Sequence, residues 1–208
     1  MEINPLLDDA QLIRLAAELF VAGSDEQARE VLRMLSNEPK RKSLSYRKAA
    51  PSATSPGHRS RVSPKAAEKF AILASSGWRC NFCGQRLVMH HLMELLSLRA
   101  PDIVSFSPEH KFKESFTHPA FVRCQHAVDH LESGALSGRW LDPDNLVAAC
   151  AACNEFKNDG LAPPFMPRVA DDWDGGASVF LALAEGQPKR FSKVVSDLRL
   201  GLRKAKGT

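Results

Sequence analysis

Apolar residues recur at helical spacing near the start of the chain and predict two short helices within residues 7–36. The first run comprises Leu12, Ile13, Leu15, Ala16 and Leu19. A Gly-Ser step breaks it, and a second run follows with Ala28, Val31, Leu32 and Leu35. A helical hairpin of this size is more often a docking or dimerisation element than a catalytic one. We therefore expect residues 1–36 to form a helical hairpin, with another protein subunit as its candidate partner.

The pattern changes after this hairpin. Residues 37–63 are rich in Ser, Pro, Lys and Arg and poor in large apolar side chains, which predicts a flexible basic linker. Ser63 and Pro64 then have the residue types of a helix N-cap and a first helical position. Gly77 is expected to end that helix.

Helical and extended patterns alternate in the middle of the chain. An apolar run without helix breakers predicts a helix over 90–98, and residues 121–131 predict a strand. Residues 146–149 lead into a second cysteine pair, and a further helix is expected to start at 153–158.

Two more helices, at about 176–185 and 190–205, are expected to end the chain. The predicted fold class is α+β and mainly helical. Its domains are the N-terminal hairpin, the linker, a central domain at 64–170 and a helical, basic extension at 171–208.

Positive charge is concentrated in two places along the chain. Its 208 residues include 28 Lys and Arg against 24 Asp and Glu, a formal net charge of +4. One cluster lies in the linker and the other near the C-terminus, and the residues predicted to bind nucleic acid are Lys40, Arg41, Lys42, Arg59, Arg61, Lys189, Arg190 and Arg203. Segregated cations suit a polyanion, because neutralised phosphates release counterions. A solvated linker and tail is the alternative for each cluster taken alone.

No apolar run reaches the roughly 20 residues that span a bilayer, so no membrane partner is expected. The first residues are acidic rather than basic and lack an apolar stretch, which does not fit a secretory signal. We expect a cytoplasmic protein. Disulfides are rarely maintained in that compartment, so paired cysteines favour metal ligation.

Four of the five cysteines stand in two Cys-x-x-Cys pairs, namely Cys80 with Cys83 and Cys150 with Cys153. Each pair presents two thiolates at the spacing of a tetrahedral zinc site, and the wide separation of the pairs means that Zn²⁺ would join two distant parts of the chain. Gly84, directly after the first pair, allows a tight turn. Redox-active or merely buried thiols are the competing interpretation. Cys124 is left over and is expected to be a small buried side chain.

Three short segments follow one another between the first cysteine pair and residue 157: Val128-Asp129-His130-Leu131, Asp144-Asn145-Leu146-Val147, and Cys150-Ala151-Ala152-Cys153-Asn154-Glu155-Phe156-Lys157. In residue type and order they resemble the motif of the HNH endonuclease family, over roughly residues 78–160. The resemblance implies a ββα-metal core, in which a hairpin and a helix hold one divalent ion. The four-cysteine zinc site would be structural.

The residues of these segments suit phosphodiester hydrolysis. His130 is suited to the role of general base, because an imidazole can take a proton from water at physiological pH. Asp129 and Asn154 offer hard oxygen ligands for a catalytic Mg²⁺ or Mn²⁺, which would act as a Lewis acid. By the resemblance, Asn145 orients the imidazole. Lys157 lies one helical turn after Asn154 on the same face, where its ammonium could hold a phosphate. A turn role for Asn145 and a helix cap at Asn154 are the alternatives.

The function expected is therefore metal-dependent cutting or nicking of DNA, with double-stranded DNA as the partner. The resemblance alone places it in bacterial defence or a mobile element. A non-catalytic, zinc-stabilised nucleic-acid-binding module and an RNA-cleaving nuclease with the same core are the alternatives. The loop after His130 lacks the Pro and the adjacent glycines of the family pattern, which bears on substrate preference.

Four other histidines are ambiguous from the sequence. His90 and His91 are adjacent on a predicted helix and point about 100° apart, so we expect one of them to pack inside. His126 has the same strand parity as His130 and is a candidate for the cleft. The sequence does not decide the role of His118.

Overall fold

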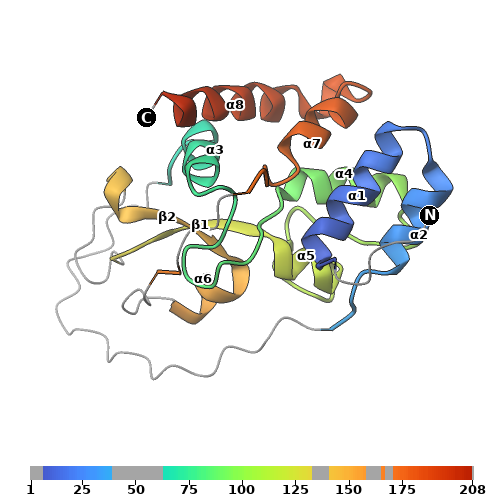
Figure 1. The fold of residues 1–208 in the computed structure, drawn as a ribbon, viewed down its shortest axis with the longest axis horizontal. Coiled ribbons are helices and arrows are strands. Elements are labelled where there is room, and N and C mark those ends of the chain that lie inside the picture. Colours follow the sequence, from blue (N-terminus) through green and yellow to red (C-terminus); the bar gives the residue numbers. More distant parts are fainter. Residues whose placement is uncertain (1–6, 39–62, 133–140, 158–164, 167–170, 208) are drawn as a thin grey trace.

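The computed structural model describes residues 7–38, 63–132, 141–157, 165–166 and 171–207. Most of the predicted basic linker and the loop after His130 lie outside these ranges. In chain order the elements are α1 (Asp9–Val21), α2 (Asp25–Arg33), α3 (Ala66–Ser75), α4 (His90–Arg99), α5 (Pro119–Cys124), β1 (His126–His130), the 3₁₀ turn η2 (Pro143–Asn145), β2 (Leu146–Cys150), α6 (Ala151–Lys157), α7 (Ala177–Ala184) and α8 (Pro188–Lys206). The fold is α+β and mainly helical, as predicted (Figure 1).

The strand predicted at 121–131 is half helix. Helix α5 occupies Pro119–Cys124, and β1 begins only at His126. The helix is favoured because Pro119 takes its first position and the His118 ring accepts a hydrogen bond from the backbone N–H of Ala120, at 3.3 Å. A short apolar run that is buried throughout has no periodicity to separate helix from strand.

Helix α3 begins later than the Ser63-Pro64 pair predicts. Its N-cap is Lys65, and the backbone N–H of Lys65 donates a hydrogen bond to the side chain of Glu68 at 2.8 Å. Gly77 ends the helix as expected, with a φ of +64° that suits glycine. Trp78 follows with a φ of +52°, and its side chain is buried. The chain turns at these two residues and then leads into the first cysteine pair.

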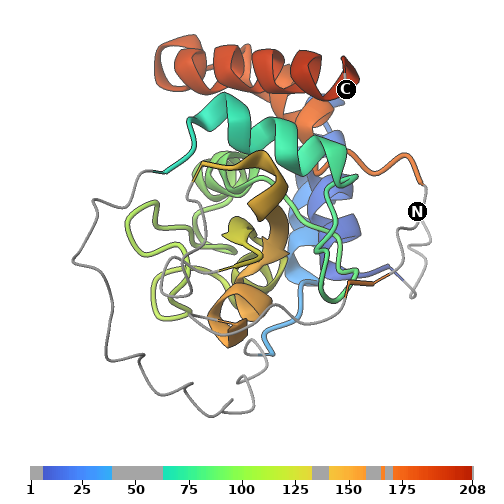
Figure 2. The ribbon, with the colours of Figure 1, turned by 90° about the vertical axis from the view of Figure 1, so that its left-hand side faces the viewer.

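A two-stranded antiparallel sheet lies at the centre of the predicted HNH-like segment. Its register pairs His126 with Cys150 at one end and His130 with Leu146 at the other. Both α3 and α6 contact both strands, and α8 packs along α3. Figure 2 shows α8, α3 and α6 one below another. Strand β2 is buried at every position, as expected for a strand with both faces covered.

Helix α8 lies unusually close to α3 because of one glycine. A Cβ built on Gly201 would lie 2.6 Å from the carbonyl oxygen of Ala67 and 2.6 Å from the Cβ of Phe70. Only a residue without a side chain lets the two helices approach to this distance.

The N-terminal helices share one continuous hydrophobic core with the rest of the described chain. Helix α1 packs against α7, α5 and α4. Its first turn is fixed by an ion pair from Arg123 to Asp9 at 2.6 Å. The apolar face of the hairpin is therefore used inside the chain, and another subunit as its partner stays a prediction. Among the described residues, no helix is long and apolar enough to cross a bilayer.

Candidate functional site

The four paired cysteines meet where β2 passes into α6. Their sulfur atoms all lie within 4.8 Å of one another. The Sγ atoms of Cys83 and Cys150 are 3.8 Å apart, and a tetrahedron with Zn–S distances of about 2.3 Å requires about the same separation. The ranges described in the structure contain no other group of three or more His, Cys, Asp and Glu side chains arranged to hold a metal.

The first pair sits in a tight turn that is attached to the hairpin. The backbone N–H of Gly84 donates to the carbonyl of Cys80 at 2.8 Å, and Gly84 has a φ of +75°. The N–H of Asn81 donates to the carbonyl of Ala148 in β2 at 2.9 Å. This backbone hydrogen bond ties the first cysteine pair directly to the strand that leads into the second.

The ionisation of the cysteines fits a dication. A hydrogen bond with Cys150 lowers the pKa of the Cys80 thiol, while a hydrogen bond with Cys153 raises the pKa of Cys150. Four thiolates this close together would repel one another without a cation. Zinc between them would remove that repulsion and fill all four of its positions with protein ligands, which makes the site structural.

Asp129 and His130 end β1. Asp129 is 8% exposed, and its Oδ1 accepts the backbone N–H of His130 at 2.8 Å. Its Oδ2 is buried and accepts no hydrogen bond from any described residue. Burial raises the pKa of this carboxyl, against the opposing effect of the Lys157 ammonium. A buried carboxylate oxygen without a hydrogen bond is suited to a hard cation.

The Lys157 side chain opposes Asp129 directly. Its Nζ lies 3.4 Å from each of the two carboxylate oxygens, and Lys157 is 4% exposed. The phosphate contact that the sequence predicts is therefore not the contact that this ammonium makes here. The sequence gives the face of α6 on which the lysine lies, but it does not reveal which strand residue that face meets.

Asn154 is half-buried and lies in the interior of α6, which begins at Ala151. The alternative of an N-cap role is therefore wrong. Its side chain makes no hydrogen bond with the part of the chain that is described. Lys157 is one helical turn later and contacts Asp129, so Asn154 lies on the face of α6 that is nearer to β1. The residues present thus fit a second, oxygen-ligated cation.

Asn145 closes the hairpin just beyond His130. Its Oδ1 accepts the N–H of Glu132 at 2.7 Å, and its Nδ2 donates to the carbonyl of Glu132 at 3.0 Å. Its own carbonyl accepts the N–H of Leu131 at 2.8 Å. The amide therefore holds the chain two residues after His130, and its predicted role in orienting the imidazole stays a prediction.

Three histidine rings meet between α4 and β1, with His126 buried and His90 and His91 half-buried, and the sequence indicated only part of this group. The His90 ring centroid is 3.8 Å from that of His91 and 4.9 Å from that of His126. His126 also lies edge-on to Trp78 and places Nδ1 3.1 Å from the carbonyl of Val88. Both adjacent histidines pack inside, where one was expected, and His126 belongs to the core rather than to the cleft. Helical and strand periodicity show which face of an element a residue lies on, but they do not show that α4 and β1 contact each other.

The remaining ambiguous residues have structural positions. His118 caps α5. Cys124 is buried as expected, and burial raises the pKa of its thiol. Neither side chain belongs to the group around Asp129.

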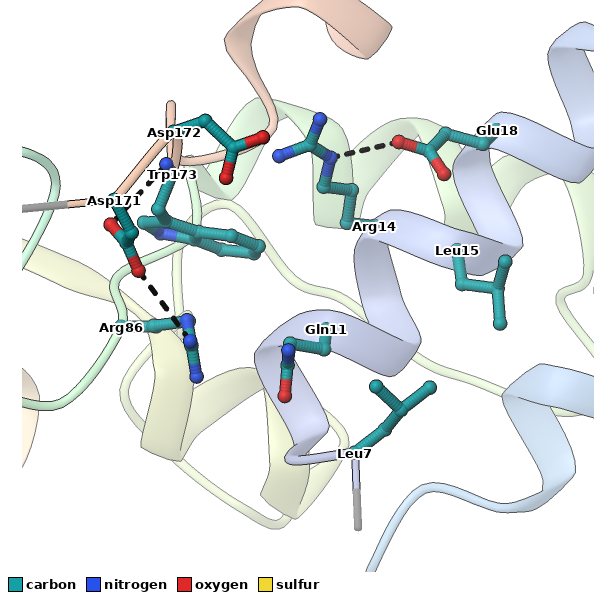
Figure 3. Close-up of a pocket in the computed structure, with 9 residues that line it drawn as sticks. All are labelled: Leu7, Gln11, Arg14, Leu15, Glu18, Arg86, Asp171, Asp172 and Trp173. Carbon is teal, nitrogen blue, oxygen red and sulfur yellow. Dashed lines mark hydrogen bonds and ion pairs between the residues drawn. The ribbon is translucent and has the colours of Figure 1, made fainter. Parts of the chain in front are cut away.

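A separate cavity of about 340 Å³ lies between α1 and residues 171–173 (Figure 3). The guanidinium groups of Arg14 and Arg86 lie 5.7 and 5.8 Å from the Trp173 ring centroid. Glu18 accepts from Arg14 at 2.8 Å, and Arg86 lies 3.5 Å from an oxygen of Asp171. These cations are already paired, so the cavity is best explained by the packing of α1 against that segment.

The predicted nucleic-acid-binding residues fall into two groups. Lys40, Arg41, Lys42, Arg59 and Arg61 lie outside the described residues. Lys189 and Arg203 are exposed on α8, whereas Arg190 donates to Glu94 of α4 at 2.7 and 3.1 Å. The structure thus leaves Lys189 and Arg203, but not Arg190, available to a partner.

Comparison with known proteins gives one match. The family model described as HNH endonuclease matches residues 117–160. No curated protein and no solved structure matches the chain. The matched segment contains β1, η2, β2 and α6, the elements around Asp129 and His130. Residues 117–160 are therefore similar to the HNH endonuclease family, and the four-cysteine cluster fits a zinc-binding subtype of it.

Proposed function

We propose that this protein is a metal-dependent endonuclease that hydrolyses phosphodiester bonds of double-stranded DNA. The observation that carries the proposal is the Asp129–His130 pair at the end of β1, within the HNH match and opposite α6. A bacterial defence or mobile-element setting and a cytoplasmic location belong to the same proposal and rest on the family resemblance.

His130 is proposed as the general base. Its backbone is fixed on one side by the Asp129 carboxylate and, two residues on, by the Asn145 amide. A ring held at this position can accept a proton from a water molecule that attacks the phosphorus atom. Asn145 is proposed as a positioning residue that keeps the strand end, and with it the imidazole, in place.

Asp129 and Asn154 are proposed to hold Mg²⁺ or Mn²⁺. Both offer oxygen ligands, and one oxygen of Asp129 is buried without a hydrogen bond among the described residues. A divalent ion bound there would supply positive charge to the phosphate and to the leaving oxygen. Cys80, Cys83, Cys150 and Cys153 are proposed to bind Zn²⁺ that takes no part in the chemistry.

Helix α8 is proposed to contact the DNA backbone. Its exposed cations, which have no ion-pair partner among the described residues, are Lys189, Lys193, Arg199, Arg203, Lys204 and Lys206. Like charges at a spacing of four residues repel one another along a helix, and a polyanion relieves that repulsion. Because α8 lies on the outer side of α3, this face would hold a stretch of DNA away from the bond being cut (Figure 2).

The test is plasmid cleavage by the zinc-loaded protein with Mg²⁺, Mn²⁺ or EDTA. His130→Ala is expected to reduce cleavage at least 1000-fold and to leave zinc content and the unfolding temperature unchanged. His110→Ala removes a histidine from the loop before α5 and serves as the matched control, with activity within about twofold of the parent. Retained cleavage by His130→Ala would remove this residue from the mechanism.

The same assay separates the alternatives. A non-catalytic module would bind DNA in a salt-sensitive manner and cut nothing with either metal. An RNA-cleaving nuclease would degrade RNA and leave the plasmid supercoiled, with the same dependence on His130.

A further inference from the structure

The Lys157 ammonium faces both oxygens of the Asp129 carboxylate. Its Nζ is equidistant from the two carboxylate oxygens, at 3.4 Å. Charge-assisted hydrogen bonds of this type are normally about 2.7–2.9 Å long. The lysine therefore faces the carboxylate as a point charge, and Oδ2 of Asp129 keeps a free acceptor position.

Burying this pair is costly for the fold. A lysine with 1% of its side chain exposed loses nearly all of its hydration, and the Asp129 side chain is only 10% exposed. Neutral residues of similar volume would pack equally well at both positions. The pair is therefore explained better by a requirement for charge at Asp129 than by stability.

Two cations cannot occupy this place together. A Mg²⁺ ion binds carboxylate oxygen at about 2.1 Å. The Lys157 Nζ lies 3.4 Å from the same oxygen. If it stayed there, the ammonium and the metal ion would be at most about 5.5 Å apart, the sum of the two distances, in a largely buried site. Mutual repulsion at that separation, with little water between the charges, favours one occupant.

We propose that Lys157 is a built-in counterion, which holds the Asp129 carboxylate in the metal-free protein and is displaced when the divalent cation binds. This inference rests on the proposed metal site at Asp129 and Asn154. The ammonium makes the metal-free site electrically neutral, so that the carboxylate need not be hydrated before the cation arrives. Once displaced, it stays on the face of α6 that carries Asn154, within reach of a phosphate at the same site.

The first experiment measures Mn²⁺ binding directly. Free Mn²⁺ is quantified by electron paramagnetic resonance during titration of the zinc-loaded protein without DNA. Lys157→Met removes the competing charge and keeps the length of the side chain, so it is expected to bind Mn²⁺ roughly 10- to 100-fold more tightly than the parent. Lys113→Met removes one exposed charge from the loop before α5 and is the matched control, expected to stay within about twofold.

Unchanged or weaker binding by Lys157→Met would overturn the counterion role. Absence of Mn²⁺ binding in every variant, the parent included, would overturn the proposed metal site as well. Loss of cleavage in His130→Ala is independent of both results, so failure of this inference and failure of the proposed function are distinguishable.

A second measurement uses the parent protein, in case Lys157→Met does not fold. Brief acetylation followed by mass spectrometry reports how accessible each lysine is. Modification of Lys157 is expected to rise at least fivefold when Mg²⁺ is added, because the displaced ammonium reaches solvent, while modification of Lys189 stays constant. Equal protection of Lys157 with and without Mg²⁺ would show that the pair persists and would refute displacement.

Discussion

Mild acid should unfold this protein through its buried histidines, and replacing one of them should make it less sensitive to pH. Burial lowers the pKa of His91 to about 3 and the pKa of His126 to about 4, and it holds the pKa of His90 well below its usual value. The neighbouring imidazoles and the ammonium of Lys111 act in the same direction. All three rings are therefore neutral in the fold at pH 7.

The unfolded chain binds protons at these positions when the folded chain does not. An exposed histidine titrates near pH 6.5, so the stabilising effect of a neutral buried ring is complete above that pH. It is lost as the pH falls from 6.5 toward the folded pKa of about 3 for His91. Between pH 7 and pH 5 the loss amounts to about 2 kcal/mol for each histidine, since one pKa unit corresponds to about 1.4 kcal/mol.

His91→Phe is the most informative substitution. The His91 ring lies 6.1 Å from the rings of Phe70 and of Phe180, and its Nδ1 is buried without a hydrogen bond among the described residues. An apolar ring at this position therefore leaves no polar partner unsatisfied at that atom. The variant is expected to lose about 2 kcal/mol less stability than the parent between pH 7 and pH 5.

The measurement is urea unfolding of zinc-loaded protein at pH 7, 6 and 5, followed by circular dichroism. Loss of zinc at low pH affects both proteins equally and cancels in the comparison. Leu198→Ala empties part of the same core without removing a titrating group, so it should lower stability equally at each pH. The same loss of stability for His91→Phe and the parent between pH 7 and pH 5 would refute the reasoning.

Three further predictions concern the zinc site, the helix crossing and the DNA-binding face. Cys150→Ser should lower bound zinc well below one ion per chain, measured by atomic absorption, and lower the unfolding temperature by about 10 °C; full zinc occupancy would contradict the ligand assignment. Gly201→Ala should destabilise the fold by about 1–3 kcal/mol in urea unfolding, because the new Cβ would lie 2.6 Å from the carbonyl oxygen of Ala67. The same substitution in an uncrowded helix normally stabilises a protein. Arg203→Ala should reduce the slope of log Kd against log salt concentration for duplex DNA by about one. Arg190→Ala should change this slope little, since Arg190 already pairs with Glu94. Equal effects of the two substitutions would argue against α8 as the DNA contact.

The parts of the site that depend on short sequence motifs could be predicted from the sequence. Two Cys-x-x-Cys pairs predict a shared zinc site, and in the structure their sulfur atoms do lie together. The Asp129–His130 pair and the helix after Cys150 follow from the order of the motif. Contacts between elements could not be predicted, because neither helical nor strand periodicity specifies which residue lies opposite. The histidine group, formed by α4 and β1, and the contact of Lys157 with Asp129 are both of this kind.

The boundary between α5 and β1 could not be predicted, because the local sequence is compatible with both a helix and a strand. Residues 121–124 contain Phe121, Val122 and Cys124, which suit a strand as well as a helix, so the sequence predicts one strand over 121–131. The cap at His118 and the proline after it decide the outcome in favour of α5. A capping histidine is a weaker sequence signal than Ser or Asp, which is why the boundary at His126 was missed.

Helix α6 runs between the cysteine cluster and Asp129, so it would connect the two proposed metal sites. It has seven residues, too few for a helix to be stable in water on its own. Its start is fixed by Cys150 and Cys153 in the cysteine cluster, and its last residue, Lys157, is fixed on Asp129. If zinc binds there, its removal would release the first anchor, and one buried ion pair would then have to hold the helix. Zinc in this protein would therefore act on the chemistry at a distance, because it sets where α6 begins and hence how the Asn154 amide meets the carboxylate at the end of β1.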